Sequence, residues 1–170
     1  MHEWADVMAG TARAAGAEIM TIYRQDFSVS HKQDASPLTQ ADLAAHRLIV
    51  SQLAALNADI PILSEESAAL DLAERRKWTR YWLVDPLDGT REFVNKNGEF
   101  TVNIALIENG LPVFGVVYAP VLDWLLIGGS GYGCRHERDG RISVGRVSSA
   151  GSPLRVAASR SHRDAQTQAF

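Results

Sequence analysis

The stretch Trp82-Leu83-Val84-Asp85-Pro86-Leu87-Asp88-Gly89-Thr90 carries most of the information about fold and chemistry in this chain of 170 residues. The continuous apolar run over residues 81–84 predicts a buried strand. The strand leads directly into two carboxylates, Asp85 and Asp88, across a proline that cannot continue a strand ladder. A turn at Pro86 would bring these carboxylates together, with the Leu87 carbonyl between them.

A second apolar run, over residues 60–63, also ends in acidic side chains, those of Glu65 and Glu66. Two strands that both deliver carboxylates at their carboxyl ends predict one shared acidic pocket. Clustered carboxylates repel each other, so they need cations or shifted pKa values to coexist. Oxygen donors with no cysteine or histidine nearby in the sequence favour magnesium or manganese over zinc. The stretch Gly89-Thr90 then opens a predicted helix, and free N–H groups at a helix start suit a phosphate.

These parts are typical of a metal-assisted phosphoester hydrolase. The structural alternative is that Asp-Pro and Asp-Gly pairs form ordinary turns, and that Glu65-Glu66 begins a solvated helix. The order of strand, acid, proline, acid, glycine and threonine, with a second strand that also ends in acids, favours the interpretation as a functional site.

The rest of the chain predicts helices followed by a hairpin-connected sheet, an α+β order rather than βαβ alternation. Apolar residues recur at helical spacing over 4–22, and a second helix begins at Thr39, where Thr39-x-x-Asp42 has the form of a capping box. Asn109-Gly110 predicts a hairpin turn. We expect loops or turns at 128–133 and 138–140, and strands at 100–106, 111–118, 122–127 and 154–158.

Composition excludes several classes of protein. With 46% hydrophobic and 22% charged residues, the chain resembles a globular domain rather than a disordered, collagen-like or coiled-coil protein. The formal charge of −3 argues against binding to a nucleic acid polymer. The lone Cys134 excludes an internal disulfide and a Cys-rich zinc site. Without a signal-peptide pattern or a transmembrane segment, we expect a cytoplasmic protein; peripheral association at the inner membrane stays open.

The stretch from Trp82 to Phe93 closely resembles the first signature of the inositol monophosphatase superfamily, whose members are magnesium-dependent, lithium-sensitive phosphatases. Three further stretches, 34–42, 63–66 and 97–106, resemble its CysQ-type 3'(2'),5'-bisphosphate nucleotidase subgroup, which residues 115–120 and 159–162 also fit. The resemblance spans essentially the whole chain. It implies N-terminal helices packed on a mostly antiparallel sheet, the first part of a layered α/β/α/β/α sugar-phosphatase-like fold.

The resemblance also implies roles for individual residues. Glu65, Asp85 and the Leu87 carbonyl would hold one magnesium ion, and Asp85 and Asp88 would hold a second. The implied catalytic residues are Asp42, Glu65 and Thr90, with the Thr90 hydroxyl, hydrogen-bonded to Asp42, orienting and deprotonating a water. Simple helix capping explains Asp42 equally well. The implied substrate-binding residues are Glu65, Leu87, Asp88, Gly89 and Thr90.

The reaction implied is hydrolysis of adenosine 3',5'-bisphosphate to AMP and phosphate, which in the family serves sulfate assimilation. The alternatives are an inositol monophosphatase, a sugar-bisphosphate phosphatase, or an inactive fragment that acts as a metal-binding module. Lys32 and Asp34 match a loop beside the family's site, although a polar loop explains them as well. Ser161-x-x-Asp164, with Arg160 or His162 nearby, is either a second phosphate site or an ordinary helix cap.

The chain departs from the family pattern at one point. Family members carry a second signature, Trp-Asp followed by Ala-Gly, and no Trp-Asp pair occurs here. We therefore expect residues 1–170 to be the N-terminal α+β metal-binding domain without the C-terminal α/β domain. The second metal site would then lack a carboxylate. The uncovered apolar face would favour self-association or a homo-oligomer.

Overall fold

The structure is a computed structural model that describes residues 2–25, 37–67, 71–147, 149 and 151. The predicted strand at 154–158, the loop residues Lys32 and Asp34, and the stretch from Ser159 to Asp164 lie outside the described residues. The elements follow in the order α1 (His2–Tyr23), α2 (Pro37–Leu56), β1 (Ile62–Ser64), α3 (Leu72–Arg75), β2 (Arg80–Asp88), α4 (Thr90–Val94), β3 (Thr101–Glu108), β4 (Leu111–Ala119), the 3-10 helix η1 (Pro120–Leu122), β5 (Trp124–Gly129), β6 (Gly133–Arg138) and β7 (Arg141–Val144).

Within this described part, the strands form one sheet of seven in chain order. Strands β1 and β2 are parallel, and every later neighbour pairs antiparallel. The expected α+β fold with a mostly antiparallel sheet is therefore confirmed. The predicted hairpin between β3 and β4 turns at Asn109 and Gly110, which both have positive φ (50° and 78°).

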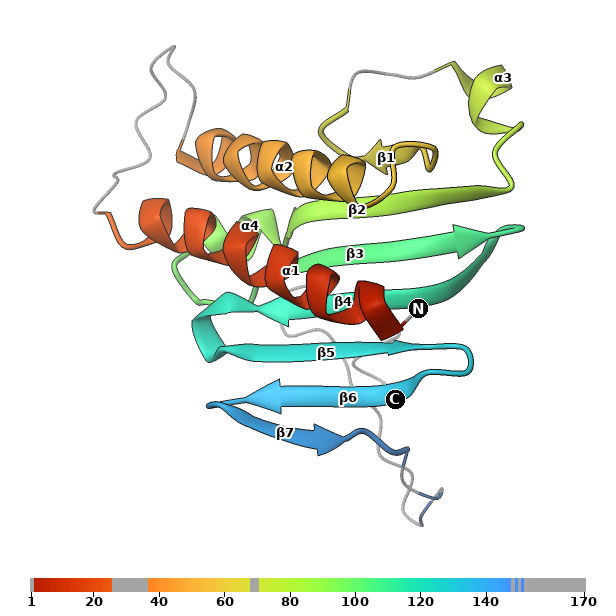
Figure 1. Ribbon diagram of the computed structural model, residues 1–170. Coiled ribbons are helices and arrows are strands. Elements are labelled where there is room, and N and C mark those ends of the chain that lie inside the picture. The colour runs from red at the N-terminus through yellow and green to blue at the C-terminus, as the bar shows by residue number, and fades with distance from the viewer. Residues whose placement is uncertain (1, 26–36, 68–70, 148, 150, 152–170) are drawn as a thin grey trace.

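Both long helices lie on one face of the sheet, α2 over β1 and β2 and α1 over β3, β4 and β5 (Figure 1). On α1 the side chains at three- and four-residue steps are fully buried, and several are alanine, so the helix lies close to the strands. These residues are Ala5, Met8, Ala12, Ala15 and Ile19. The opposite face of the sheet leaves Leu83, Val117 and Leu126 exposed, at 43%, 42% and 38%.

Two of the differences between the structure and the sequence prediction lie in α2 and in the glycine-rich stretch 128–133. Helix α2 begins at Pro37 rather than Thr39, because proline suits the first turn of a helix, where its missing N–H has no partner to lose. The glycine-rich stretch 128–133 is not all loop, since Gly128 and Gly129 end β5 and Gly133 begins β6. A side chain at Gly129 would collide with Phe114, so glycine here permits close packing rather than a turn.

Candidate metal and phosphate site

The two strands that end in acids lie side by side, as expected. Strand β1 pairs with β2 in parallel up to the pair Ser64 and Val84. The Glu65 N–H then donates to the Val84 carbonyl over 3.1 Å. Glu65 and Asp85 therefore both follow the last residues paired between β1 and β2, so they lie side by side at the carboxyl end of β1, while β2 continues along β3.

A β-bulge brings Asp88 to the same edge. Strand β2 pairs with β3 at Asp85 opposite Asn103 and next at Asp88 opposite Thr101. Two residues of β2, Pro86 and Leu87, therefore oppose a single residue of β3. Proline has no N–H to donate, so it is tolerated where the ladder is interrupted. Strand β2 thus continues through the proline, and the bulge sets Asp88 beside Asp85, close enough for their charges to repel.

The chain after Asp88 can turn only because residue 89 is glycine. Gly89 has a φ of +95°, a conformation that L side chains rarely adopt. A Cβ at this position would lie 2.8 Å from the Glu99 carbonyl oxygen. Helix α4 then begins at Thr90 and contacts α2, the helix that carries Asp42. The backbone from Leu87 to Thr90 is therefore a tight, fixed segment next to the carboxylates.

Asp42 lies on α2 with only 9% of its surface exposed. The pKa of Asp42 is raised to about 7, first by burial, then by charge repulsion and a side-chain hydrogen bond with Glu66, and less by repulsion from Asp85 and Glu65. The hydrogen bond expected between Asp42 and Thr90 stays a prediction.

Asp85 shows the same effect to a smaller degree. Burial, followed by repulsion from Asp88 and Glu65 and a side-chain hydrogen bond with Glu65, raises the pKa of Asp85 to about 6, and the Leu87 N–H, which donates to the carboxylate, opposes this increase. One buried carboxyl oxygen of Asp85 has no hydrogen-bond partner, and the same is true of Asp42. Buried polar atoms without partners are rare in native proteins.

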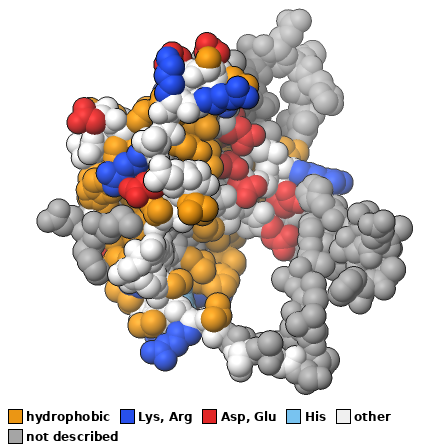
Figure 2. Space-filling view, turned by 90° about the vertical axis from the view of Figure 1, so that its right-hand side faces the viewer, with side chains coloured by type: hydrophobic (Ala, Val, Ile, Leu, Met, Phe, Trp, Pro, Cys, Tyr) orange, Lys and Arg blue, Asp and Glu red, His pale blue; other side chains and the backbone are white. Residues whose placement is uncertain are grey.

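These observations fit a divalent cation. Magnesium prefers hard oxygen donors, and this site offers carboxylate oxygens, two of them without a hydrogen-bond partner, and a neighbouring carbonyl. A cation would also supply the positive charge that the repelling carboxylates lack. Within the residues the structure describes, no group of three or more His, Cys, Asp or Glu side chains lies together closely enough to hold a metal ion by itself. Acidic side chains gather on one face of the molecule beside hydrophobic ones (Figure 2). The site is thus an open group of carboxylates.

Sequence reasoning missed four residues at this edge. Thr101 and Asn103 contact each other, and Asn103 contacts Asp88. His46 on α2 contacts Ser64 at the end of β1. The two-residue alternation of β3 puts Thr101 and Asn103 on one face, which could have marked them, whereas nothing in the sequence pairs His46 with Ser64.

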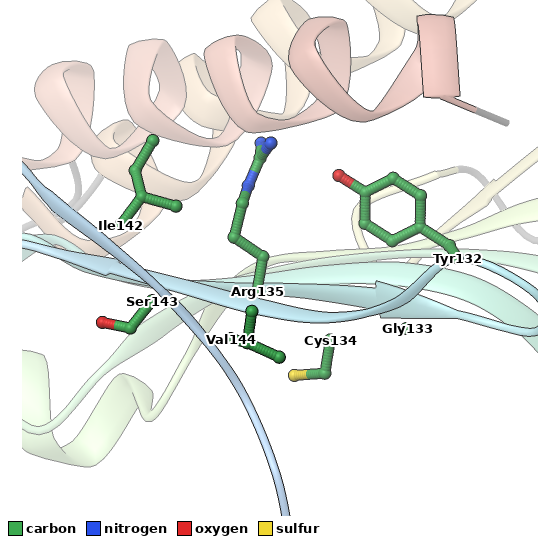
Figure 3. A pocket seen from close by; sticks show the side chains of 7 residues that line it. All are labelled: Tyr132, Gly133, Cys134, Arg135, Ile142, Ser143 and Val144. Atoms are coloured by element: carbon green, nitrogen blue, oxygen red, sulfur yellow. The ribbon is translucent and has the colours of Figure 1, made fainter.

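A separate hollow of about 350 Å³ lies on the hairpin of β6 and β7, lined by residues 132–135 and 142–144 (Figure 3). Its one cationic side chain, Arg135, is already paired with Glu137 at 2.8 Å and with Asp6 at 3.3 Å. None of the predicted site residues lines this hollow. The carboxylate group at the edge of β1 and β2 therefore remains the candidate site.

Comparison with known sequences indicates one protein family. A model of the inositol monophosphatase family matches residues 1–170. The 3'(2'),5'-bisphosphate nucleotidase CysQ of Salmonella typhimurium is 51% identical over 155 residues, which cover 90% of this chain and 62% of that protein. The CysQ nucleotidase of Escherichia coli K12 is 46% identical over 167 residues, 97% of this chain and 67% of that protein.

Solved structures of the same family also resemble this chain. The crystal structure of CysQ from Bacteroides thetaiotaomicron, a bacterial member of the inositol monophosphatase family, aligns with a TM-score of 0.78 and 38% identity over 98% of this chain and 66% of that chain. An inositol monophosphatase from Anabaena aligns with a TM-score of 0.65 and 29% identity over 79% and 47%. The chain spans 62% and 67% of the length of the two CysQ relatives. Separately, no described helix is long and apolar enough to span a bilayer.

Proposed function

This chain belongs to the inositol monophosphatase family, and from that premise we propose that it carries the metal and phosphate site of a magnesium-dependent phosphatase. The proposed reaction is hydrolysis of adenosine 3',5'-bisphosphate to AMP and phosphate. The observation that carries the proposal is the group of carboxylates at the edge of β1 and β2, where buried oxygens of Asp42 and Asp85 lack partners.

Four groups would hold the cations. Glu65, Asp85 and the Leu87 carbonyl would hold one magnesium ion, and Asp85 with Asp88 would contribute to a second. When bound, magnesium supplies positive charge that neutralises the phosphate and lowers the pKa of water. The neighbouring strands support this assignment, because the Glu65 N–H is bonded to the Val84 carbonyl and so holds Glu65 beside Asp85.

Asp42 and Thr90 would together remove the proton from the attacking water. A group with a pKa of about 7 can both accept and release a proton at neutral pH. In the proposed mechanism the Thr90 hydroxyl orients the attacking water and passes its proton towards Asp42. Contact between α2 and α4 supports this pairing, because it brings the helices that carry the two residues together.

The phosphate would lie against the backbone of residues 87–90. Gly89 allows the chain to turn there, and Thr90 begins α4, whose first N–H groups are not used within the helix. Glu65 and Asp88 would border the same phosphate. The backbone N–H of Leu87 is not available, because it already donates to Asp85. Gly89 and Thr90 therefore carry more of the proposed phosphate contact than Leu87 does.

The substrate class rests on the relatives. Those that are 51% and 46% identical are 3'(2'),5'-bisphosphate nucleotidases, which favours a nucleotide bisphosphate. An inositol phosphate is the second candidate, because a structural neighbour at 29% identity is an inositol monophosphatase. A sugar bisphosphate is the third.

We further propose that residues 1–170 act as the family's N-terminal α+β metal-binding domain. The Trp-Asp signature that contributes a carboxylate to the second ion in the family does not occur in this sequence. Within this sequence, the second ion would be held by Asp85 and Asp88. The alternative proposal is a metal-binding module that binds magnesium without turning over a substrate.

One assay separates these functions. The chain is incubated with magnesium and either adenosine 3',5'-bisphosphate, inositol 1-phosphate or fructose 1,6-bisphosphate, with and without lithium, and released phosphate is measured. Lithium-sensitive release from the nucleotide alone is expected, and Asp85→Asn should abolish it. Release only from inositol phosphate or sugar bisphosphate would reassign the substrate. Calorimetric binding of magnesium with no release from any substrate would indicate an inactive module.

A further inference from the structure

Two consecutive hydrogen bonds connect Thr101, at the start of β3, through Asn103 to the candidate ligand Asp88. Thr101 Oγ1 donates to Asn103 Oδ1 over 3.1 Å, and Asn103 Nδ2 donates to Asp88 Oδ2 over 3.0 Å. Thr101 and Asn103 are two residues apart on one strand, so their side chains share a face of the sheet. The bulge in β2 brings Asp88 to this face, because its backbone pairs with Thr101.

The chemistry of the three side chains fixes the direction of both bonds. An ionised carboxylate only accepts hydrogen bonds, so Asn103 must turn its NH₂ group towards Asp88. Its carbonyl oxygen then faces Thr101, whose hydroxyl can donate. Thr101 thereby prevents the amide of Asn103 from rotating and presenting an oxygen to the carboxylate.

Asp88 needs such support because of where it lies. Its side chain is exposed, and it follows the bulge where Pro86 interrupts the ladder. Asp85 stands opposite Asn103 in the strand register, and the charges of Asp85 and Asp88 repel each other. Without a donor, Asp88 would be free to rotate away from Asp85 into solvent. The Asn103 amide holds one of its oxygens and so sets the direction of the other.

We propose that Thr101 and Asn103 are positioning residues that hold the carboxylate of Asp88 in the orientation it needs as a cation ligand. This inference rests on the proposed function, in which Asp88 is a ligand. Neither residue contacts the reacting atoms in the proposed mechanism, so both act through Asp88. Groups that orient ligands in this way typically change metal affinity by about 10- to 100-fold when removed.

The test is a titration of the metal-free chain with manganese, followed by electron paramagnetic resonance, on the chain and on Thr101→Val, Thr101→Ser and Asn103→Leu. Valine suits a strand and removes only the hydroxyl, whereas serine keeps it and serves as the matched control. We expect Thr101→Val and Asn103→Leu each to weaken binding about 10-fold, and Thr101→Ser to bind like the parent. The double variant Thr101→Val/Asn103→Leu should be no weaker than Asn103→Leu alone, because both changes break one chain of bonds.

A second readout needs no metal. In the NMR spectrum of the metal-free chain, the Asn103 side-chain NH₂ signals should move in Thr101→Val and in Asp88→Ala but not in Thr101→Ser. Unchanged manganese affinity in Thr101→Val, equal losses in the serine and valine variants, or additive losses in the double variant would each overturn the inference. Metal binding without phosphate release would contradict the proposed phosphatase activity but would not contradict this inference. A parent chain that binds no manganese would overturn both.

Discussion

The Nδ1 atom of His46 lies 2.8 Å from the Ser64 hydroxyl, in a hydrogen bond that joins α2 to the last residue of β1. His46 is one helical turn from Asp42, and Ser64 directly precedes Glu65. Ser64 is buried, with 4% of its surface exposed. This bond therefore ties the helix that carries one candidate site residue to the strand end that carries another.

Removing this bond should destabilise the chain. In His46→Ala the buried Ser64 hydroxyl loses its partner, which we expect to cost about 1–2 kcal/mol. Urea unfolding followed by circular dichroism measures the loss. His46→Asn is the matched control, since an asparagine amide nitrogen lies close to the position of Nδ1 in histidine. Asparagine should restore most of the stability, and an asparagine variant as unstable as the alanine variant would contradict the role given to this bond.

The stability of the metal-free chain should fall as pH rises. The pKa of Asp42 is about 7 in the folded chain against 3.8 for an ordinary aspartate. The folded state therefore binds protons more tightly than the unfolded state, so the stabilisation is complete below about pH 4 and is lost as pH rises through about 7. Asp85, with a pKa of about 6, acts in the same direction.

With about 2.7 kcal/mol from Asp42 and about 1.4 kcal/mol from Asp85, we expect the free energy of unfolding in EDTA to decrease by about 4 kcal/mol between pH 5 and pH 8. Thermal melts across that range measure it. Asp42→Asn has no carboxyl proton to lose and should flatten the profile. A parent profile that rises from pH 5 to pH 8 would contradict the raised pKa values of Asp42 and Asp85.

Magnesium should restore the stability that the metal-free chain loses at high pH. An ion that binds only the folded chain stabilises it by about 2.7 kcal/mol at a concentration 100 times its dissociation constant. Asp85→Asn should show two opposite effects, since it removes both a ligand and a repelling charge. We expect its metal-free melting temperature at pH 8 to be higher than that of the parent, and its response to magnesium to be lost. Sodium chloride at matched ionic strength is the control for screening.

Gly89 should tolerate no side chain. In Gly89→Ala the Cβ would meet the Glu99 carbonyl oxygen at 2.8 Å, and φ would remain at +95°. We expect a loss of about 2–4 kcal/mol in urea unfolding, from strain and the collision together. Gly110→Ala is the matched control, with a φ of +78° and nothing within 4 Å of its Cβ. Gly110→Ala should cost only about 1 kcal/mol, and equal losses in the two variants would contradict the account of Gly89.

Self-association through the open face of the sheet is also testable. Leu83, Val117 and Leu126 point away from the helices and are exposed. Apolar surface of this kind favours contact with a second copy. Sedimentation velocity should show a concentration-dependent shift to larger species, which Leu126→Lys should suppress. A parent chain that stays monomeric across the whole concentration range would exclude this interface.

Part of this structure could be predicted from the sequence because single strands carry their own signals. Continuous apolar runs followed by acids predicted β1, β2 and their shared acidic edge, and Asn109-Gly110 predicted the hairpin of β3 and β4. Strands β6 and β7 were not predicted, and they carry charged side chains, among them Arg135 and Glu137. Those charges face α1, where Arg13 pairs with Glu137 at 2.8 Å and Arg135 pairs with Asp6 at 3.3 Å.

The details of the site were harder to predict because they depend on packing between distant elements. The position of Asp42 beside Glu66 follows from how α2 lies on β2, which no local pattern encodes. The bulge likewise depends on which residues of β2 and β3 pair, and only the pairing shows that Asp88 lies alongside Asn103 and Thr101.

The ion pair between α1 and β6 also bears on how the chain folds as it is synthesised. Arg13 and Glu137 are 124 residues apart in the sequence. At about 5–20 residues per second, roughly 6–25 s separate the synthesis of the two partners. During that interval α1 lacks its ion pair with β6, and its apolar side chains are not yet covered by the complete sheet. Helix α1 is thus synthesised well before the strand that secures it, and its apolar side chains are open to chaperones during that interval.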